Sequence, residues 1–224
     1  MVYIDHVPLE QYGARLQLAW RVTGANALGE YYRPRYGTGL VLMGGVDAGL
    51  KTITLPVDIY GDSPRDVTLR KSVLDAAAAR GRVELYLPDG LYYTAVVQTL
   101  GQLDWASDTL AGCTYEFAGL AHDPAVCVTV NGPMACASTV PRTDCVLSVT
   151  VGTAAASYNL AGVRFTDVDA GDTLTLDGWT KRVLINGVPA AQRCDIVEWP
   201  YLAPGANAIT APDPVTVRYY PTYL

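Results

Sequence analysis

The sequence predicts a mainly β protein with an N-terminal β domain containing one α-helix (residues 1–122) and a C-terminal β-sandwich or jelly roll (residues 123–224). Three observations support this fold class. Only one segment, at about residues 63–80, has the apolar spacing of a helix. Beyond the turn dipeptide Asp123-Pro124, the apolar patterns have the spacing of strands. The chain of 224 residues is also long enough for two domains of ordinary size.

Alternating apolar and polar residues predict the strands of the N-terminal domain. Residues 15–22 alternate in this way, which predicts one half-buried strand with Leu18 and Trp20 on its buried face. Residues 51–60 repeat the pattern, with Ile53 and Leu55 among the residues of the buried face. The further strands expected in this domain span residues 40–43, 83–87, 91–99 and 113–120.

The single helix has recognisable signals at both ends. Ser63 can cap it, Pro64 suits the first helical position, and Asp66 stands where the acid of a capping box belongs. Gly81 is placed to end it in the left-handed conformation. We expect its apolar stripe to pack on a sheet, with binding to a partner as the alternative role. The residues of that stripe are Leu69, Val73, Ala76 and Ala77.

Short strand patterns follow one another through the C-terminal part. The dipeptide Asn186-Gly187 predicts a tight hairpin, because both central residues of a type I′ turn need positive φ. Residues 153–156 are expected to form a loop. The number and spacing of the patterns are typical of a β-sandwich or jelly roll. The expected strands span residues 126–130, 145–151, 158–165, 173–176, 181–185, 207–210 and 215–220.

The charge of the chain argues against nucleic-acid binding. It has 16 basic and 22 acidic residues, a formal net charge of −6, and no basic cluster longer than Lys181-Arg182. Sequence-specific DNA or RNA binding is therefore not expected. Only 17% of residues are charged, against about 25% in typical soluble domains. This deficit indicates surface reserved for other protein chains, although a β-rich fold alone would also explain it.

The cysteines favour neither disulfides nor a metal site. The five cysteines are an odd number, and the N-terminus lacks the pattern of a signal peptide, so we expect cytosolic synthesis with reduced thiols. Cys127, Cys136 and Cys145 are evenly spaced but do not have the paired spacing of a zinc site. We expect the cysteines to be small buried side chains. No metal, no other cofactor and no membrane span are expected.

No catalytic set is predicted. Nucleophilic catalysis needs a base beside a Ser or Cys, and the chain has only His6, near the terminus, and His122, at the expected linker. Acidic residues cluster near Gly171, where turn formation explains them. Calcium binding and glycoside hydrolysis are the alternatives for this cluster. Its members are Asp167, Asp169, Asp172 and Asp177.

Aromatic residues predict two candidate contact surfaces. The chain has 15 tyrosines against two phenylalanines, and tyrosine suits half-buried positions at interfaces and sugar-binding faces. One candidate is a protein-contact patch, because tyrosine and arginine interleave there; it comprises Tyr31, Tyr32, Arg33, Arg35 and Tyr36. The other is a set of sugar-stacking rings, Trp179, Trp199 and Tyr201. Packing within the protein's own domain is the alternative for both.

The order of these elements resembles a known family. Residues 171–177 (GDTLTLD), the hairpin at residues 183–187 and residues 198–210 (EWPYLAPGANAIT) resemble the C-terminal domain of the distal tail proteins of long-tailed, siphovirus-type phages. Upstream, Gly44-Gly45 before the 51–60 strand, then the helix and the hairpin at residues 83–99, follow in the order expected for the N-terminal domain of that family.

The resemblance implies a structural protein of the virion tail, made in the cytoplasm of the bacterial host. The N-terminal domain would assemble head to tail into a hexameric ring, and the C-terminal domain would be a galectin-like sandwich outside that ring. The ring would join the tail tube protein to the tail-tip protein and to receptor-binding proteins, and DNA would pass through its lumen. It also implies that the protein is not an enzyme.

The chain is short for that family and shows no long arm for gripping receptor-binding proteins, so a role in adhesion is left open. The competing hypothesis is a carbohydrate-binding β-sandwich module for recognition of the host surface. It would use Trp179, Trp199 and Tyr201 as stacking platforms. A hydrolase that uses the acids of residues 167–177 is the third hypothesis.

Overall fold

The computed structural model describes residues 1–24, 27–32 and 41–224, with backbone only for residues 27–32 and 41–48. It confirms the predicted fold class, because strands dominate and the described residues contain one α-helix, α1 (Pro64–Ala78). The chain divides into two compact units, one formed by residues 1–122 and the other by residues 123–223. Each unit is described by itself.

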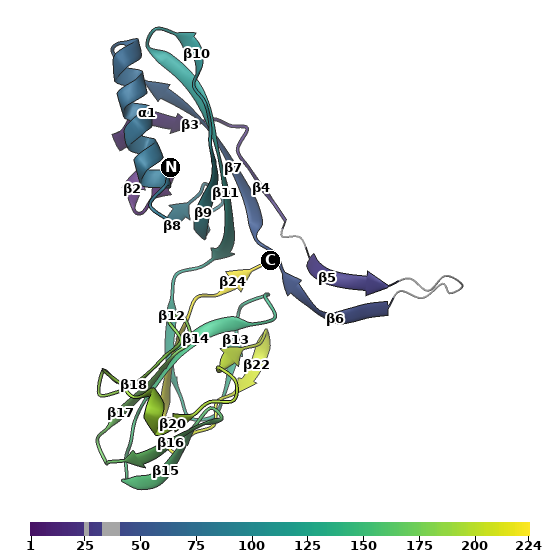
Figure 1. Cartoon of the computed structure of the whole chain (residues 1–224), viewed down its shortest axis with the longest axis vertical. Helices are drawn as coiled ribbons and strands as arrows, with labels where there is room; N and C mark the ends of the chain where they lie inside the picture. The colour runs from purple at the N-terminus through teal and green to yellow at the C-terminus, as the bar shows by residue number, and fades with distance from the viewer. Residues whose placement is uncertain (25–26, 33–40) are drawn as a thin grey trace. The chain divides into compact units, whose positions relative to one another are not determined.

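The first unit is built on one antiparallel sheet with α1 on one of its faces (Figure 1). Alternate residues of the long central strands point toward α1, so Ile53, Leu55, Val57 and Ile59 are all buried, as predicted. The 3-10 helix η1 (Leu9–Tyr12) contacts α1. In order, the sheet contains β2 (Val7–Pro8), β1 (Tyr3–Ile4), β8 (Arg82–Tyr86), β9 (Tyr92–Leu100), β11 (Leu110–His122), β7 (Lys51–Tyr60) and β3 (Ala14–Leu16), with β10 (Asp104–Ser107) paired to β11 and β4 (Arg21–Thr23) paired to β7.

Helix α1 begins where the sequence predicts. The Ser63 hydroxyl accepts a hydrogen bond from the Asp66 amide at 3.2 Å, and the Asp66 carboxylate accepts one from the Asp62 amide at 3.0 Å. The first hydrogen bond satisfies an amide that the first turn leaves without a helical partner, and the second ties the residue before the cap to the helix. Pro64 occupies the first helical position, where its missing N–H costs nothing.

The predicted buried stripe of α1 was wrong. Leu69 and Val73 are 56% and 58% exposed, and Ala76 is exposed as well. The helix carries two apolar stripes, and the stripe that packs against the sheet is not the predicted one. Spacing alone cannot say which of two apolar faces meets the sheet. The buried residues are Val67, Leu74, Ala77 and Ala78, so only Ala77 of the predicted set is correct.

The single strand predicted at residues 15–22 is two strands. Leu16 of β3 pairs with Val57, whereas Arg21 of β4 pairs with Thr54, so residues loop out between the two pairings. Leu18 lies in this excursion and is fully exposed, at 101%. The alternation of apolar and polar residues continues through this loop, so the sequence pattern did not reveal where β3 ends and β4 begins.

A separate two-stranded antiparallel sheet joins β5 (Ala27–Tyr32) to β6 (Val41–Ala48). Its register shifts between Leu28 and Glu30, which marks a bulge.

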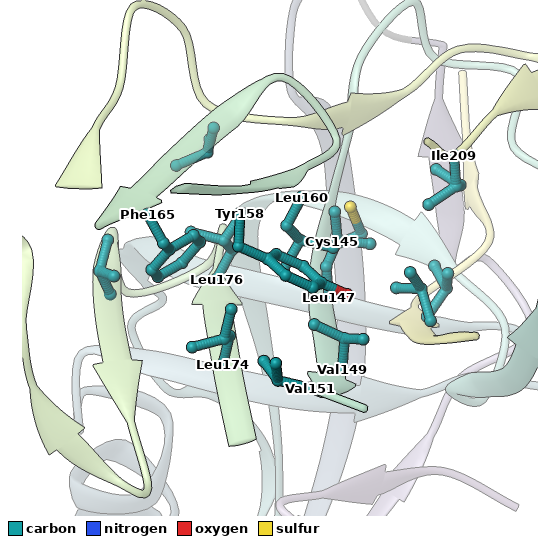
Figure 2. Close-up of a cluster of buried hydrophobic side chains, with 14 of the residues drawn as sticks. Cys145, Leu147, Val149, Val151, Tyr158, Leu160, Phe165, Leu174, Leu176 and Ile209 are labelled. Carbon is teal, nitrogen blue, oxygen red and sulfur yellow. The ribbon is translucent and has the colours of Figure 1, made fainter. Parts of the chain in front are cut away.

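The second unit has a large antiparallel sheet and a smaller three-stranded sheet that enclose one core. Side chains of the larger sheet, such as Leu147 and Leu174, meet Tyr158 and Phe165 of the smaller sheet in this core (Figure 2). The larger sheet runs in the order β12 (Val126–Val130), β23 (Val215–Tyr219), β14 (Thr143–Thr150), β17 (Thr173–Asp177), β18 (Arg182–Ile185) and β19 (Val188–Pro189), with β21 (Tyr201–Leu202) on β14; the smaller sheet is β15 (Ala155–Leu160), β16 (Val163–Val168) and β20 (Cys194–Asp195). The remaining elements are the pair β13 (Pro133–Cys136) and β22 (Gly205–Ala208), the 3-10 helix η2 (Ala191–Arg193) and the short β24 (Thr222–Tyr223).

Two turns in this unit show what sequence can and cannot detect. Asn186 and Gly187 have φ of 52° and 78° between β18 and β19, which confirms the predicted hairpin. The strand predicted at residues 158–165 is instead a hairpin, because Ala161 and Gly162 turn the chain with φ of 50° and 87°. An alanine at positive φ is uncommon, so Ala161-Gly162 is a much weaker hairpin signal than Asn186-Gly187. The loop predicted at residues 153–156 is also shorter, since β15 begins at Ala155.

All five cysteines are unpaired. Cys113, Cys136 and Cys145 are buried, as predicted, but Cys127 is exposed and Cys194 is half-buried. Burial raises the pKa of the Cys145 thiol to about 12, so this thiol is un-ionised at neutral pH.

Candidate interaction surfaces

Trp179 lies on the surface of the second unit, immediately after β17. The Asp177 carboxylate accepts hydrogen bonds from the Trp179 and Thr180 amides at 2.9 and 3.0 Å, which shapes the turn. Gly178 passes so close to β14 that an added Cβ would lie 2.5 Å from the Cys145 carbonyl oxygen. The indole N–H then donates to the Asp144 carbonyl at 3.1 Å.

Cations cover faces of the three rings singled out by the sequence. The Arg218 guanidinium lies 5.4 Å from the ring centre of Trp179, which also packs on Tyr220 at 5.1 Å. The Lys181 ammonium lies 5.7 Å from the Trp199 ring, and the Arg142 guanidinium lies 4.4 Å from the Tyr201 ring. Such contacts stabilise aromatic side chains at the surface.

Ion pairs connect the rings into one surface. Lys181 pairs with Asp144 at 2.9 Å, and Arg142 pairs with Glu198 at 2.8 Å. Asp144 also stands opposite Tyr201 in the pairing of β14 with β21. The structure therefore brings Trp179, Trp199 and Tyr201 into one connected cluster, which we call the Trp-Tyr cluster.

A cavity of about 540 Å³ adjoins the Trp-Tyr cluster and is lined in part by Trp199, Tyr201 and Asn207. The Asn207 side chain is committed to the neighbouring turn. Its amide oxygen accepts from the Ala203 N–H at 2.8 Å, and its amide nitrogen donates to the Ala203 and Gly205 carbonyls at 2.7 and 2.9 Å. An amide engaged in this way has no donor left for a sugar hydroxyl.

The predicted Tyr-Arg patch is not placed by the structure. Tyr31 and Tyr32 lie on β5, of which only the backbone is described. Arg33, Arg35 and Tyr36 lie outside the described residues. The patch stays a prediction.

Two of the four acidic residues near Gly171, Asp172 and Asp177, hydrogen-bond to the turns around them. The Asp172 carboxylate accepts from the Asp169 amide at 2.9 Å and from the Asn186 side chain at 2.8 Å, and these hydrogen bonds lower its pKa. Burial raises the pKa of Asp177, but hydrogen bonds from Thr180 and the Trp179 amide outweigh it, so the net shift is downward. Among the described residues, no group of three potential metal-ligating side chains is present. A carboxyl group with a lowered pKa is ionised at neutral pH, so it accepts hydrogen bonds and has no proton to give. This favours a role in the turn over a role as a general acid.

A row of aromatic residues in the first unit was not anticipated. Tyr3, Tyr86, Tyr92 and His122 stand beside one another on β1, β8, β9 and β11, with ring centres 5.9, 4.9 and 6.0 Å apart in that order. The three tyrosines are half-buried. Finding the row from sequence would have required the register of four strands, since only Tyr86 and Tyr92 are near in the chain.

The two histidines have structural contacts. His122 is the last residue of β11 and not a linker residue; it is 5% exposed, and its Nε2 lies 3.0 Å from the Thr94 hydroxyl. His6 is largely exposed and lies 3.5 Å from the Glu84 carboxylate.

Within the described part of the chain, no helix has the length and apolar character needed to cross a membrane.

Comparison with known proteins points to phage tails. Residues 141–223 match the family model of the C-terminal domain of siphovirus-type tail components. No curated protein matches the chain. Among solved structures, the Dit (gp 19.1) protein of phage SPP1 has the same fold over 100% of this chain and 98% of its own, with a TM-score of 0.79 and 15% identity.

Chains from the phage p2 baseplate are more distant. In two structures of its activated conformation, with Sr and with Ca, they match 93% of this chain and 90% of their own. The TM-score is 0.50 in both cases, with identities of 8% and 7%. The resemblance to the distal tail proteins of long-tailed phages is thus confirmed: residues 141–223 match the C-terminal domain of siphovirus-type tail components, and the whole chain has the fold of SPP1 Dit.

Proposed function

We propose that this protein is a ring-forming hub at the end of a phage tail, joining the tail tube to the tail tip or baseplate. The observation that carries this proposal is the fold match to SPP1 Dit across both units and nearly the full length of each chain. That protein is described as a paradigm of the hub adsorption apparatus in phages that infect Gram-positive bacteria. The role proposed is structural, without a catalytic step.

We assign different tasks to the two domains. Residues 1–122 would form a ring of six copies, and residues 123–224 would form the β-sandwich outside it. Exposed large apolar residues support this division, because the first unit carries most of them. Among the described residues of 1–122 they are Met1, Leu18, Leu50, Tyr60, Leu69, Val73, Val96, Leu100 and Trp105, against Val188, Val197, Tyr201 and Leu224 in residues 123–224.

The proposed partners are further copies of this chain, the tail tube protein, a tail-tip protein and receptor-binding proteins. The lumen of the ring would let DNA pass. The net charge of −6 supports passage without binding, since an acidic protein has little attraction for phosphates. Production in the bacterial cytoplasm and incorporation into the virion tail follow from this role.

Light scattering across concentrations, followed by negative-stain imaging, tests the hub proposal. We expect particles of six times the 24.0 kDa chain mass, seen as closed rings. If the protein alone is monomeric, the same imaging is repeated after mixing with the tube and tip proteins of its phage. Absence of the protein from assembled tail ends would contradict the proposal.

A carbohydrate-binding module is the second candidate, favoured by the cavity beside Trp199 and Tyr201. Two observations count against it: the Asn207 amide already donates to backbone carbonyls, and cations lie over the Trp199 and Tyr201 rings. Retention on immobilised cell-wall glycans that is lost in Trp199→Ala and kept in Val188→Ala would support it. No retention of the unaltered protein would rule out this use of the cluster for the glycans tested.

A further inference from the structure

Two asparagines of the second unit are followed directly by glycine. They are Asn131, in the turn between β12 and β13 (Figure 1), and Asn186, in the hairpin between β18 and β19. The backbone nitrogen of the next residue can attack an asparagine side chain, and glycine permits this most readily because it has no Cβ to crowd the approach. By residue type alone, the two Asn-Gly pairs are equally reactive.

The fold holds the Asn186 side chain at both ends of its amide. The amide oxygen accepts a hydrogen bond from the Thr173 N–H at 2.8 Å, and the amide nitrogen donates to the Asp172 carboxylate at 2.8 Å. The backbone N–H of Asn186 also donates to the Thr173 carbonyl at 2.8 Å. Attack on the side-chain carbonyl carbon requires the side chain to turn, so its two hydrogen bonds must break first.

The Asn131 side chain has no such restraint. It is exposed, and it takes part in no hydrogen bond within the part of the chain that the structure describes. A Cβ added to Gly132 would meet no heavy atom within 4 Å, so the space beside the reacting nitrogen is open. The two Asn-Gly pairs therefore share their chemistry and differ in the freedom of the asparagine side chain.

We propose that Asn131 is a site of spontaneous deamidation and that the fold protects Asn186 from the same reaction. The Gly132 nitrogen attacks the side-chain carbonyl carbon of Asn131, and a nitrogen–carbon bond forms. The bond from that carbon to the amide nitrogen breaks, and ammonia leaves with the proton that the Gly132 nitrogen gives up. Water then opens the cyclic imide at either of its carbonyls, which yields aspartate or isoaspartate.

The reaction changes the turn between β12 and β13 in charge and in length. Both products carry a carboxylate in place of a neutral amide, so each event adds a negative charge to a chain of net charge −6. Isoaspartate also routes the backbone through the former side chain, which lengthens the turn by a carbon atom. Val130 pairs with Val215 and Pro133 pairs with Ala208, so the added atom lies between strands of two different sheets.

Ageing of the purified chain tests the proposal. The protein is kept folded at mildly alkaline pH, sampled over time and digested with trypsin, and mass spectrometry follows the mass gain of amide-to-acid conversion. Trypsin places the two asparagines in different peptides, because Arg142 and Lys181 lie between them. Asn131 should deamidate roughly tenfold faster than Asn186 or more, since Asn186 must first break two hydrogen bonds.

The unfolded chain is the matched control. In concentrated guanidinium chloride the hydrogen bonds of Asn186 are absent, so both asparagines should deamidate at similar rates. In the folded protein, Asp172→Ala removes one acceptor of the Asn186 amide and should raise the Asn186 rate several-fold, while the Asn131 rate stays unchanged. Circular dichroism checks that this variant is folded, and the guanidinium comparison decides the result if it is not.

Equal rates for Asn131 and Asn186 in the folded chain would overturn the proposal, as would faster conversion of Asn186. If Asn131 stays intact in the folded chain and converts in guanidinium chloride, the fold protects this turn as well and the assigned site is wrong. An unchanged Asn186 rate in folded Asp172→Ala would reject the hydrogen bonds as the cause of protection. None of these outcomes bears on the hub proposal, which is tested on assembled tails.

Discussion

The two units handle apolar surface in different ways. In the second unit, two sheets cover each other, so the apolar side of most strands finds a partner within the chain (Figure 2). In the first unit, one sheet has a helix on one face, and a helix with two apolar stripes buries only one of them. The second unit therefore buries its apolar side chains within itself, whereas the first leaves one apolar stripe of its helix exposed.

The largest effect is expected in the core of the second unit. Phe165 is fully buried between the two sheets, so Phe165→Ala should lower the free energy of unfolding of that unit by about 3–5 kcal/mol. Chemical denaturation followed by circular dichroism measures this change. Val197→Ala, at a fully exposed position, should change it by less than about 0.5 kcal/mol. Similar losses in both variants would contradict the described core.

Two leucines on α1 sharpen the comparison within the first unit. Leu74 is 1% exposed and Leu69 is 56% exposed. Leu74→Ala should therefore cost about 2–4 kcal/mol of unfolding free energy, and Leu69→Ala less than about 1 kcal/mol. Both are measured on dilute protein, below the concentration of self-association. A larger loss for Leu69→Ala would mean that the stripe predicted from sequence is the buried one after all.

The cap of α1 should give a smaller effect. Ser63→Ala removes the acceptor of the Asp66 amide and should cost about 1 kcal/mol of unfolding free energy. Ser72→Ala, on the exposed face of the same helix, is the control and should be neutral or slightly stabilising, because alanine favours helix. Equal effects would show that the hydroxyl of Ser63 does not cap.

The smallest effect concerns pH and the turn before Trp179. The pKa of Asp177 is lower in the folded protein than its ordinary value, so ionisation of this group favours the fold. That contribution is present above about pH 4 and fades as the pH falls through the folded pKa. Asp177→Asn should be less stable than the unaltered protein at pH 7, and the difference should shrink toward pH 2.5. Thermal unfolding across this range measures it, and a constant difference would contradict the assigned cause.

Sequence patterns found most strands because burial on one side of a strand leaves a local trace. The strand predicted at residues 126–130 has the observed bounds, and the Asn186-Gly187 turn forms where expected. The errors occurred where backbone geometry departs from local preference. Ala161 turns the chain at positive φ, and residues 17–20 loop out of an alternating pattern.

For the candidate surfaces as well, residue types could be read from the sequence, whereas contacts between distant residues could not. Residue type alone singled out Trp179, Trp199 and Tyr201. Their connection through Asp144, Lys181 and Arg142 depends on contacts between residues up to 59 positions apart, from Arg142 to Tyr201. The aromatic row of Tyr3, Tyr86, Tyr92 and His122 likewise exists only through strand register.

The fold class, the position of the helix and the resemblance to distal tail proteins could be predicted from the sequence, because each depends on local periodicity, end signals or the order of elements. Which stripe of α1 is buried and which is exposed follows from the packing of the helix on the sheet. Both stripes satisfy the helical period, and the choice between them is made by the sheet, whose strands lie both before and after the helix in the chain. As a result, Leu69 and Val73 are exposed and Leu74 and Ala77 are buried.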